Sequence, residues 1–394
     1  MSMPDIFPFK GLYFNPKRVS LSGVLCPPYD AIGEKDARVL RAKKFNSIHL
    51  DLSAGVKKDG YRQAAKLWES WRKDGTIVRD DACAIYILEE NFRYGEKSFR
   101  RLGFLALVSL SPRNLAQIIP HEKTLPIPRA DRLKVLEMVK ANLSPIFTVY
   151  PDPKGKTEDL IRQLIKGKKF ERGRLPVFPH TDCRLWRIDA AHQIAAIQRA
   201  LKKAPLFVAD GHHRLGAACD YFKQNGNPEA GKILAYFCAE DDPGLLVLPT
   251  HRILPKKILD EARDLCDLKS VPSLAILQNL LEKESDPYAF GIYESGKCFL
   301  AFPRDHGDCQ SLLTLEWLNY NLLCQISPQD IHYSSDARAA KKMADSLGGA
   351  AILVPSFSVA DVRRAAQILG LLPPKSTYFY PKVSSGFAFH AFEN

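Results

Sequence analysis

The sequence predicts a mixed α/β protein. Short apolar runs of the length of buried strands alternate with stretches of helical periodicity along most of the chain. The clearest example is the apolar run 205–209, which passes through Asp210-Gly211 into a small-residue helical stretch ending near Phe222. With 394 residues, the chain is long enough for two or three domains with sizeable cores.

We expect three portions: an N-terminal α/β portion at 1–112, a core at 113–252 that carries the corner after the run 205–209, and a C-terminal α/β portion at 253–394. In the first two portions, apolar periodicity predicts helices at 60–73, 129–143, 158–165 and 190–201 and strands at 83–88, 102–108, 118–119, 144–150, 184–188 and 233–239. The strands 83–88 and 102–108 are expected to form a hairpin with an extended turn region. In the third portion we expect helices at 258–266, 272–284, 312–324 and 361–369, a hairpin at 290–300 and a strand at 350–355.

Composition is that of an ordinary cytoplasmic protein. The chain has 56 basic and 44 acidic residues, a net charge of +12, and its basic pairs are spread along the sequence, so nucleic acid is disfavoured as a partner but stays open. No apolar run approaches the ~20 residues of a membrane helix, and the first residues lack a signal-peptide pattern. Nine scattered cysteines without a Cys-x-x-Cys pair indicate reduced thiols.

The most informative stretch is Asp210-Gly211-His212-His213-Arg214, a strand-to-helix corner. The first turn of a helix offers unpaired N–H groups and a positive dipole end, and glycine allows close approach of an anion such as phosphate. Arg214 is a candidate for bidentate phosphate binding, and His212 and His213 for a hydrogen bond or a proton. In the structural alternative, Asp210 caps the helix and pairs with Arg214.

Other candidates come from polar residues near predicted strand ends. Asp30 follows two prolines that hold it in a defined direction, where it either faces a pocket or caps a helix beginning near Ala31. His121 and Glu122 lie between a strand and a helix, and Glu122 is alternatively a surface carboxylate paired with Lys123 or Arg129.

Three further stretches carry candidate groups. The acidic run 240–242 after a strand is a candidate magnesium site. His251 and Arg252 bring cationic groups to a strand end. Lys375 and Tyr378 belong to a polar and aromatic segment that either covers a ligand or packs as a tail.

The chain resembles a prokaryotic family, domain-of-unknown-function family 1015 (DUF1015). The motifs that carry this resemblance are spread over almost the whole chain: Pro27-Pro28-Tyr29-Asp30, the stretch 120–124, the segment 131–142, Ala209 to Arg214, 249–252 and 375–382. The Gly-His-His-Arg corner is also similar to the nucleotide-phosphate motif of the ParB and sulfiredoxin superfamily, which includes free-serine kinases. His212 stands where sulfiredoxins have a reactive cysteine, and only Arg214 matches the two arginines of the partition proteins.

These resemblances imply a ParB/sulfiredoxin-like core with N-terminal and C-terminal additions, and a nucleotide-dependent kinase acting on a small hydroxylated metabolite such as free serine. The expected cofactors are ATP or ADP and Mg²⁺, with the metal at Asp210. Glu122 corresponds to the base of the free-serine kinases. The alternatives are a nucleotide-binding regulatory protein of the ParB type with DNA or protein partners, and a metabolite-binding protein without turnover. The substrate, the choice of nucleotide and the oligomeric state stay open.

The expected site residues fall into three groups. Those expected to act in catalysis are Glu122, His212 and Asp210. Those expected to hold the nucleotide are Gly211, His212, His213, Arg214, His251 and Arg252. Those expected to contact the substrate are His121, Asp30, Lys375 and Tyr378.

Overall fold

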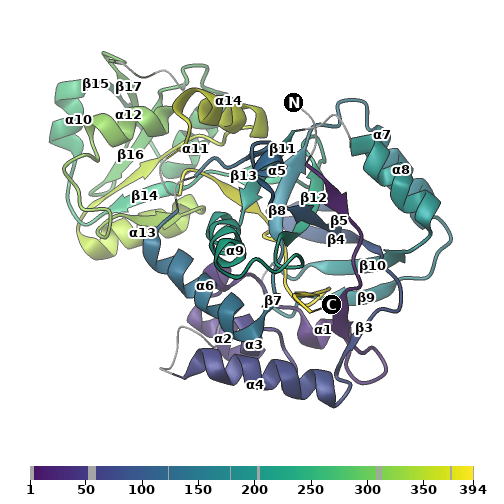
Figure 1. The fold of residues 1–394 in the computed structure, drawn as a ribbon. Helices are drawn as coiled ribbons and strands as arrows, with labels where there is room; N and C mark the ends of the chain where they lie inside the picture. Colours follow the sequence, from purple (N-terminus) through teal and green to yellow (C-terminus); the bar gives the residue numbers. More distant parts are fainter. Residues whose placement is uncertain are drawn as a thin grey trace. The chain divides into compact units, whose positions relative to one another are not determined.

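The computed structural model describes residues 4–51, 59–122, 124–177, 179–201, 205–307, 309, 313–372 and 375–393 (Figure 1). The chain divides into two compact units. Unit 1 comprises Met1–Pro120, Thr124–Leu246 and Pro381–Asn394, and unit 2 comprises His121–Lys123 and Val247–Tyr380. Both contain helices packed on sheets, which confirms the α/β class. The predicted portions 1–112, 113–252 and 253–394 divide the chain in order along the sequence, and as domains they stay a prediction.

Unit 1 is built on a mixed sheet that has nine strands within the described residues, in the order β6-β11-β8-β12-β5-β4-β10-β9, with β1 added beside β5. Its strands in the sheet are β1 (Ile6–Phe7), β4 (Ile85–Tyr94), β5 (Lys97–Ser109), β6 (Ile118–Ile119), β8 (Ile146–Tyr150), β9 (Glu171–Arg174), β10 (Asp182–Ile188), β11 (Leu206–Asp210) and β12 (Lys232–Ala239). Two small ribbons pair β2 (Leu12–Phe14) with β3 (Ile77–Arg79) and β7 (Ala141–Asn142) with β21 (His390–Ala391). Its helices are α1 (Leu21–Val24), η1 (Tyr29–Ala31), α2 (Glu34–Arg41), α3 (Ile48–Asp51), α4 (Gly60–Lys73), α5 (Pro112–Leu115), α6 (Pro126–Val139), α7 (Lys156–Ile165), α8 (Ala191–Leu201) and α9 (His212–Asn225).

The core of unit 1 lies between one face of this sheet and four helices. Alternate residues of β5 and β12, such as Phe104 and Phe237, stack at 4.7 Å between ring centroids and face the helices. Apolar residues of α6, α7, α8 and α9 belong to the same buried cluster. Period-two alternation in the strands and period-3.6 spacing in the helices thus bury one continuous layer.

On the opposite face of the sheet, the strand β5 carries a buried arginine. Arg101 of β5 is fully buried and donates from Nε and Nη2 to Oε2 of Glu90, at 2.9 and 2.7 Å. Its guanidinium lies over the rings of Phe147 and Tyr236, at 4.9 and 5.5 Å from their centroids. It also donates to the carbonyl of Pro381 at 2.6 Å, which fixes the start of the segment that returns to unit 1.

Unit 2 contains an antiparallel sheet in the order β15-β17-β16-β19-β14-β18. One face packs against α10 and α12, and the other against α11 and α13. The strands are β13 (Leu246–Leu248), β14 (His251–Leu254), β15 (Cys266–Val271), β16 (Phe290–Glu294), β17 (Lys297–Pro303), β18 (His332–Ser334), β19 (Ala350–Leu353) and β20 (Tyr378–Tyr380), of which β13 begins at the last residue of unit 1. The helices are α10 (Leu259–Leu265), α11 (Leu274–Lys283), α12 (Thr314–Asn321), α13 (Ala337–Leu347) and α14 (Val359–Leu369).

Most predicted elements are present, and the differences have local causes. The hairpin of β4 and β5 has a tight turn at Gly95-Glu96, not an extended one, because its polar strand ends pair as far as Tyr94 and Lys97. The helix expected at 129–143 begins earlier, at Pro126, because proline is favoured in the first helical turn. Residues 251–254, which follow a predicted strand, themselves form the strand β14. The short strand β15 and the alanine-rich helix α13 were not predicted.

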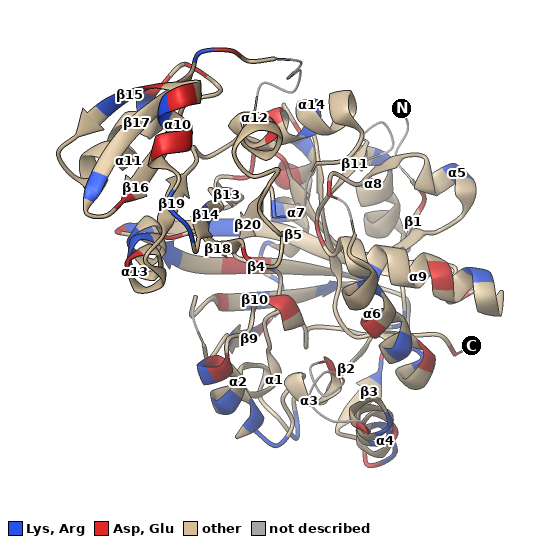
Figure 2. Cartoon of the chain, turned by 90° about the vertical axis from the view of Figure 1, so that its left-hand side faces the viewer, with Lys and Arg blue, Asp and Glu red and all other residues tan. Residues whose placement is uncertain are grey.

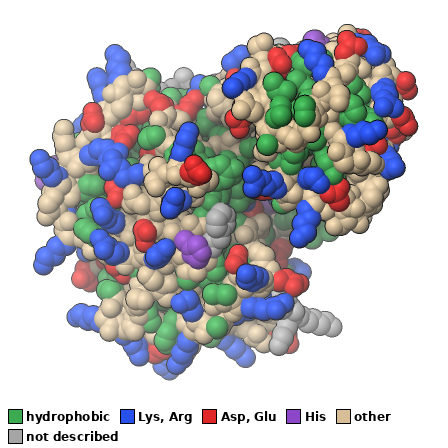
Figure 3. All heavy atoms as spheres, turned by 180° about the vertical axis from the view of Figure 1, so that it is seen from behind, with side chains coloured by type: hydrophobic (Ala, Val, Ile, Leu, Met, Phe, Trp, Pro, Cys, Tyr) green, Lys and Arg blue, Asp and Glu red, His purple; other side chains and the backbone are tan. Residues whose placement is uncertain are grey.

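Charged residues are interspersed over the chain. Figure 2 and Figure 3 show lysines and arginines mixed with acidic residues in both units, as the spread of basic pairs in the sequence predicts. Within the described residues, no helix combines the length and the apolar character needed to cross a bilayer.

The buried pair of Arg101 and Glu90 predicts a specific stability pattern. Replacing Arg101 with Met leaves the Glu90 carboxylate buried without a partner, and should lower the free energy of unfolding by about 3–5 kcal/mol. The double substitution Arg101→Met and Glu90→Met removes both charges and should recover much of this loss. Urea unfolding followed by tryptophan fluorescence measures both variants. A double variant as unstable as Arg101→Met alone would contradict this account of the pair.

Candidate functional site

The predicted corner is present between β11 and α9. The strand Leu206–Asp210 is buried up to its last residue, and Gly211 is the N-cap of α9 with φ of +93°. This left-handed backbone conformation favours glycine, and a Cβ at this position would lie 3.1 Å from Cγ2 of Ile146. Glycine also has no side chain to cap the first turn of α9. The sequence therefore predicts this corner correctly, and the reason is the backbone geometry that Gly211 permits.

The N-terminus of α6 lies beside that of α9 (Figure 1). The N–H of Leu125, the N-cap of α6, donates to Nε2 of His213 at 2.9 Å. The two helices are further joined by Arg129, which donates to both carboxylate oxygens of Asp220 at 2.7 and 2.6 Å. Neither N-cap provides a side-chain hydrogen bond to its helix. Two helices of 14 residues each thus present their positive dipole ends at one place.

A chain of ion pairs lies beside these helix ends. Nζ of Lys382 contacts Oδ2 of Asp30 at 2.5 Å and Oδ1 of Asp210 at 2.8 Å. The guanidinium of Arg214 pairs with Oδ2 of Asp210 and donates to the carbonyl of Pro145. Burial lowers the pKa of Lys382, but the carboxylates of Asp210 and Asp30 outweigh it and hold that pKa above its ordinary value. Lys382 is therefore charged at neutral pH, and the cluster contains two basic and two acidic side chains.

The cluster joins three of the predicted site residues, Asp30, Asp210 and Arg214. It does so through Lys382, which the sequence analysis did not select, although it stands in the predicted motif 375–382. A lysine 172 positions after Asp210 in the sequence has no local pattern that points to it.

Two local predictions at this site are wrong. Asp210 does not cap α9, because Gly211 is the N-cap, although the predicted pair with Arg214 is present. Asp30 does not cap a helix at Ala31, because it lies inside the short helix η1, and the next helix begins at Glu34. Its carboxylate instead contacts Lys382.

The arrangement does not fit a resident magnesium ion at Asp210. Both carboxylate oxygens of Asp210 are in contact with cations, and an ammonium group stands between Asp30 and Asp210, where a metal would need to bind. The described residues contain no group of three or more His, Cys, Asp or Glu suited to a metal. In the acidic run 240–242, Asp242 accepts N–H groups of Leu102 at 2.9 Å and Gly244 at 2.7 Å, and so holds the loop to β5.

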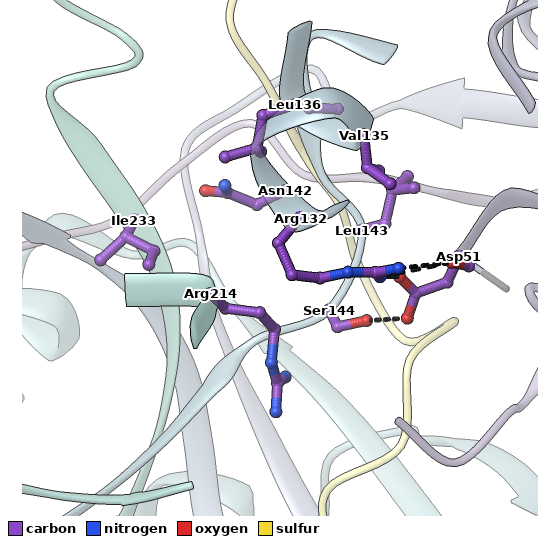
Figure 4. Close-up of a pocket in the computed structure, with 10 residues that line it drawn as sticks. Asp51, Arg132, Val135, Leu136, Asn142, Leu143, Ser144, Arg214 and Ile233 are labelled. Atoms are coloured by element: carbon purple, nitrogen blue, oxygen red, sulfur yellow. Dashed lines mark hydrogen bonds and ion pairs between the residues drawn. The ribbon is translucent and has the colours of Figure 1, made fainter. Parts of the chain in front are cut away.

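A small pocket adjoins Arg214. It is lined by Asp51, Arg132, Val135, Leu136, Ala141, Asn142, Leu143, Ser144, Arg214 and Ile233 (Figure 4). The guanidinium of Arg132 points toward Asp51, whereas the side chain of Arg214 extends toward the bottom of the view (Figure 4). A cavity volume of about 30 Å³ holds one or two water molecules and not a nucleotide.

A second group of predicted residues, namely His121, Glu122, Lys375 and Tyr378, lies in unit 2. Oε1 of Glu122 accepts the N–H of Lys375 at 2.6 Å, and Nε2 of His121 lies 2.8 Å from Oγ1 of Thr377. Lys375 has φ of +61°, which is strained for a residue with a side chain. Of the two alternative partners of Glu122, Arg129 pairs instead with Asp220, and Lys123 lies outside the described residues. Tyr378 lies in β20, with its ring 6.2 Å from that of Tyr380.

His251 and Arg252 are buried at the start of β14. Nδ1 of His251 accepts the N–H of Val354 at 3.3 Å, and burial, aided by the charge of Arg252, lowers the pKa of His251 to about 4. Arg252 is 2% exposed, and burial lowers its pKa to about 10. His251 is therefore neutral at pH 7, whereas Arg252 is charged.

Comparison with known proteins identifies the family. The model of the family described as "Protein of unknown function (DUF1015)" matches residues 6–321, and the chain belongs to this family, as its motifs predict. None of the curated proteins compared matches the chain. The ParB/sulfiredoxin-like core stays a prediction.

Several solved structures are similar at low identity. A free serine kinase in complex with AMP is 12% identical, with a TM-score of 0.38, over 72% of this chain and 92% of that one. A conserved hypothetical protein from Pyrococcus furiosus is 12% identical, with a TM-score of 0.35, over 72% and 95%. SbnI with a C-terminal truncation, from Staphylococcus aureus, is 10% identical, with a TM-score of 0.39, over 71% and 85%.

The lowered pKa of His251 predicts a pH dependence of stability. Unfolded histidine binds a proton near pH 6.5, whereas His251 in the folded protein does so only near pH 4. The unfolded state therefore binds more protons between these values, so His251 should remove up to about 3 kcal/mol of stability as the pH falls from 6.5 to 4. Burial raises the pKa of Asp242 to about 6, which acts in the opposite direction.

The variant His251→Gln isolates this contribution, because Asp242 acts equally in both proteins. Urea unfolding at several pH values from 4 to 7 should show a smaller loss of stability for His251→Gln than for the unmodified protein. Equal slopes would contradict a proton-free, buried His251.

Proposed function

We propose that this DUF1015 protein binds the phosphate groups of a nucleotide at the N-termini of α6 and α9 and transfers a phosphoryl group to the hydroxyl of a small metabolite. The observation that carries the proposal is the convergence of the two helix ends at Leu125 and His213, beside the buried cations Arg214 and Lys382. Helix N-termini bind phosphate through backbone N–H groups and the positive end of the dipole. Pro126 and Pro128 at the start of α6 have no N–H, so α6 contributes mainly its dipole and the first turn of α9 supplies the N–H groups. The positive φ of Gly211 turns the chain at this corner without a side chain in the way.

The ion pairs have a clear role in this proposal. An unpaired carboxylate at position 210 would repel a phosphate placed at the start of α9. Arg214 and Lys382 neutralise Asp210 and hold it in place, with side chains that are each 10% exposed. The two cations are balanced by Asp30 and Asp210, so the excess positive potential comes from the helix ends. His212 and His213, the first two residues of α9, belong to the proposed nucleotide site.

The phosphoryl-transfer part rests on the similarity of Gly211-His212-His213-Arg214 to the nucleotide-phosphate motif of the ParB and sulfiredoxin superfamily, which includes free-serine kinases. Phosphoryl transfer depends mainly on positioning and on charge neutralisation. Glu122, which corresponds to the base of the free-serine kinases, accepts the proton of the substrate hydroxyl. Its side chain is oriented by the N–H of Lys375. Because Asp210 does not fit a resident metal, no step is assigned to magnesium at that residue.

The phosphate site is tested by nucleotide-induced thermal shifts. The four nucleotides ATP, ADP, CTP and GTP are each added with and without Mg²⁺. A nucleotide that binds the native state alone raises the free energy of unfolding by about 2.7 kcal/mol at 100 times its Kd, and so raises the melting temperature. Lys382→Met removes the ammonium group that pairs with Asp30 and Asp210 and leaves the cluster with an excess negative charge. It should therefore weaken nucleotide binding at least about tenfold.

The matched control is Arg263→Met, which removes an exposed cation that pairs with Asp260 on α10. It should leave nucleotide affinity unchanged. Absence of a shift with every nucleotide would overturn the proposal, and equal affinities for Lys382→Met and the control would remove the corner from the site.

The base is tested by Glu122→Gln. Glutamine keeps an oxygen that accepts the N–H of Lys375 but has no charge to accept a proton, so kcat with serine or another hydroxylated acceptor should fall at least about 100-fold. The nucleotide-induced thermal shift should be unchanged. Retained turnover would contradict the role of Glu122, and loss of nucleotide binding would indicate a structural role. If nucleotide binds and no hydroxylated acceptor is turned over, the protein is a nucleotide-binding regulator.

A further inference from the structure

Arg252 is a buried cation with unusual partners. Its guanidinium donates from Nη1 to the carbonyl of Thr250 and from Nη2 to the carbonyl of Lys375, the latter at 3.3 Å. Among the residues that the structure describes, no carboxylate forms an ion pair with it. Glu122 attracts it only from a longer distance, and Oε1 of Glu122 already accepts the N–H of Lys375. The ring of Tyr333, with its centroid 5.7 Å away, covers the guanidinium without supplying a full charge.

The residue that contacts Arg252 also carries an unused hydroxyl. Thr250 is 7% exposed, and its Oγ1 is buried without any hydrogen-bond partner. Buried hydroxyl groups almost always have a partner, because leaving one unsatisfied is costly. A positive guanidinium and an unsatisfied hydroxyl therefore occur at one place, at the start of β14.

Both groups are suited to the same ligand. A guanidinium has five donors in a planar fork that matches the two oxygens of a carboxylate, and a threonine hydroxyl is a further donor to such an oxygen. Both acceptors are backbone carbonyl oxygens, and that of Lys375 is the more distant, so its hydrogen bond with Arg252 is the weaker of the two. Lys375 is held in its strained conformation by Glu122 on its N–H and by Arg252 on its carbonyl.

We propose that Arg252 and Thr250 bind the carboxylate of the acceptor metabolite, which is thus a small hydroxy acid or hydroxy amino acid. This inference rests on the proposed function, in which Glu122 accepts the proton of the acceptor hydroxyl. The carboxylate takes the place of the Lys375 carbonyl on Nη2 of Arg252 and accepts the hydroxyl of Thr250. No bond is formed or broken at this subsite, which only positions the acceptor.

The substitution Thr250→Val separates binding from folding. Valine has nearly the shape of threonine and removes a hydroxyl that has no partner, so the melting temperature of the ligand-free protein should stay equal or rise. If the role of Thr250 is purely structural, the substitution should not change the affinity for any ligand. The proposal predicts in addition that the affinity for a carboxylate ligand falls about tenfold or more, because a hydrogen bond to a charged group is lost. The control is Thr76→Val, the same substitution at another buried threonine, which lies in unit 1.

The experiment is a thermal-shift titration of the full chain with L-serine, D-glycerate, glycerol and inorganic phosphate. Serine or glycerate should raise the melting temperature and glycerol, which lacks the carboxylate, should not. Thr250→Val should weaken this effect, Thr76→Val should not, and Arg252→Lys should weaken it because lysine keeps the charge without the fork. Equal affinities for Thr250→Val and the unmodified protein, or a shift with phosphate alone, would overturn the proposal.

A nucleotide titration of the same samples separates the two proposals. If nucleotides raise the melting temperature and serine and glycerate do not, the carboxylate subsite is overturned and the phosphate site is left intact. If serine or glycerate raises the melting temperature and no nucleotide does, the proposed function is overturned. Arg252 and Thr250 then form the binding site of a carboxylate-binding protein.

Discussion

The contact of Lys382 with Asp30 and Asp210 is the interaction on which the unit 1 site depends. It joins three segments that are far apart in the sequence: η1, the end of β11 and the C-terminal segment that follows β20. Two further contacts hold the same C-terminal segment. Arg101 donates a hydrogen bond to the carbonyl of Pro381, and β21 pairs with β7. A single ammonium group thus keeps two carboxylates close together next to the start of α9. Without it their mutual repulsion would favour a more open corner.

The neutrality of this cluster sets what the corner can bind. Within the cluster each cation is balanced by a carboxylate, so an approaching anion is not attracted by the side chains alone. The converging ends of α6 and α9 supply a positive potential that those ion pairs do not cancel, and the backbone N–H groups give it direction. A divalent metal at Asp210 would have to compete with both Arg214 and Lys382. These features favour an anion at the helix ends over a cation at the carboxylates.

Local patterns made the corner predictable, and long-range contacts made the rest of the site unpredictable. The apolar run before Asp210, the Gly211 turn and the periodicity after it define β11 and α9 from neighbouring residues alone. The partners of these residues do not follow from any local pattern: His213 meets Leu125, and Asp210 meets Lys382. The strand β14 was missed because its first residues, His251 and Arg252, are polar, and burial of a histidine and an arginine in a strand contradicts the usual apolar pattern.

That departure from the pattern is best understood by comparing the buried arginines of the described residues. Arg101 pairs with Glu90, and burial of its charge is offset at short range. Arg132 pairs with Asp51 and Asp131, whose carboxylates outweigh the effect of burial and hold its pKa above the ordinary value. Arg252 is buried to the same degree, but its hydrogen bonds to the described residues go to carbonyl oxygens, and burial lowers its pKa instead.

The different environment of Arg252 calls for a different explanation. Where folding alone requires a buried guanidinium, this protein places a carboxylate within ion-pair distance, as at Glu90 and Asp51. An apolar residue at position 252 would allow β14 to pack equally well against β18 and β19. A charge kept without a carboxylate partner from the described chain, next to a hydroxyl without a partner, is explained when the missing oxygens belong to a ligand.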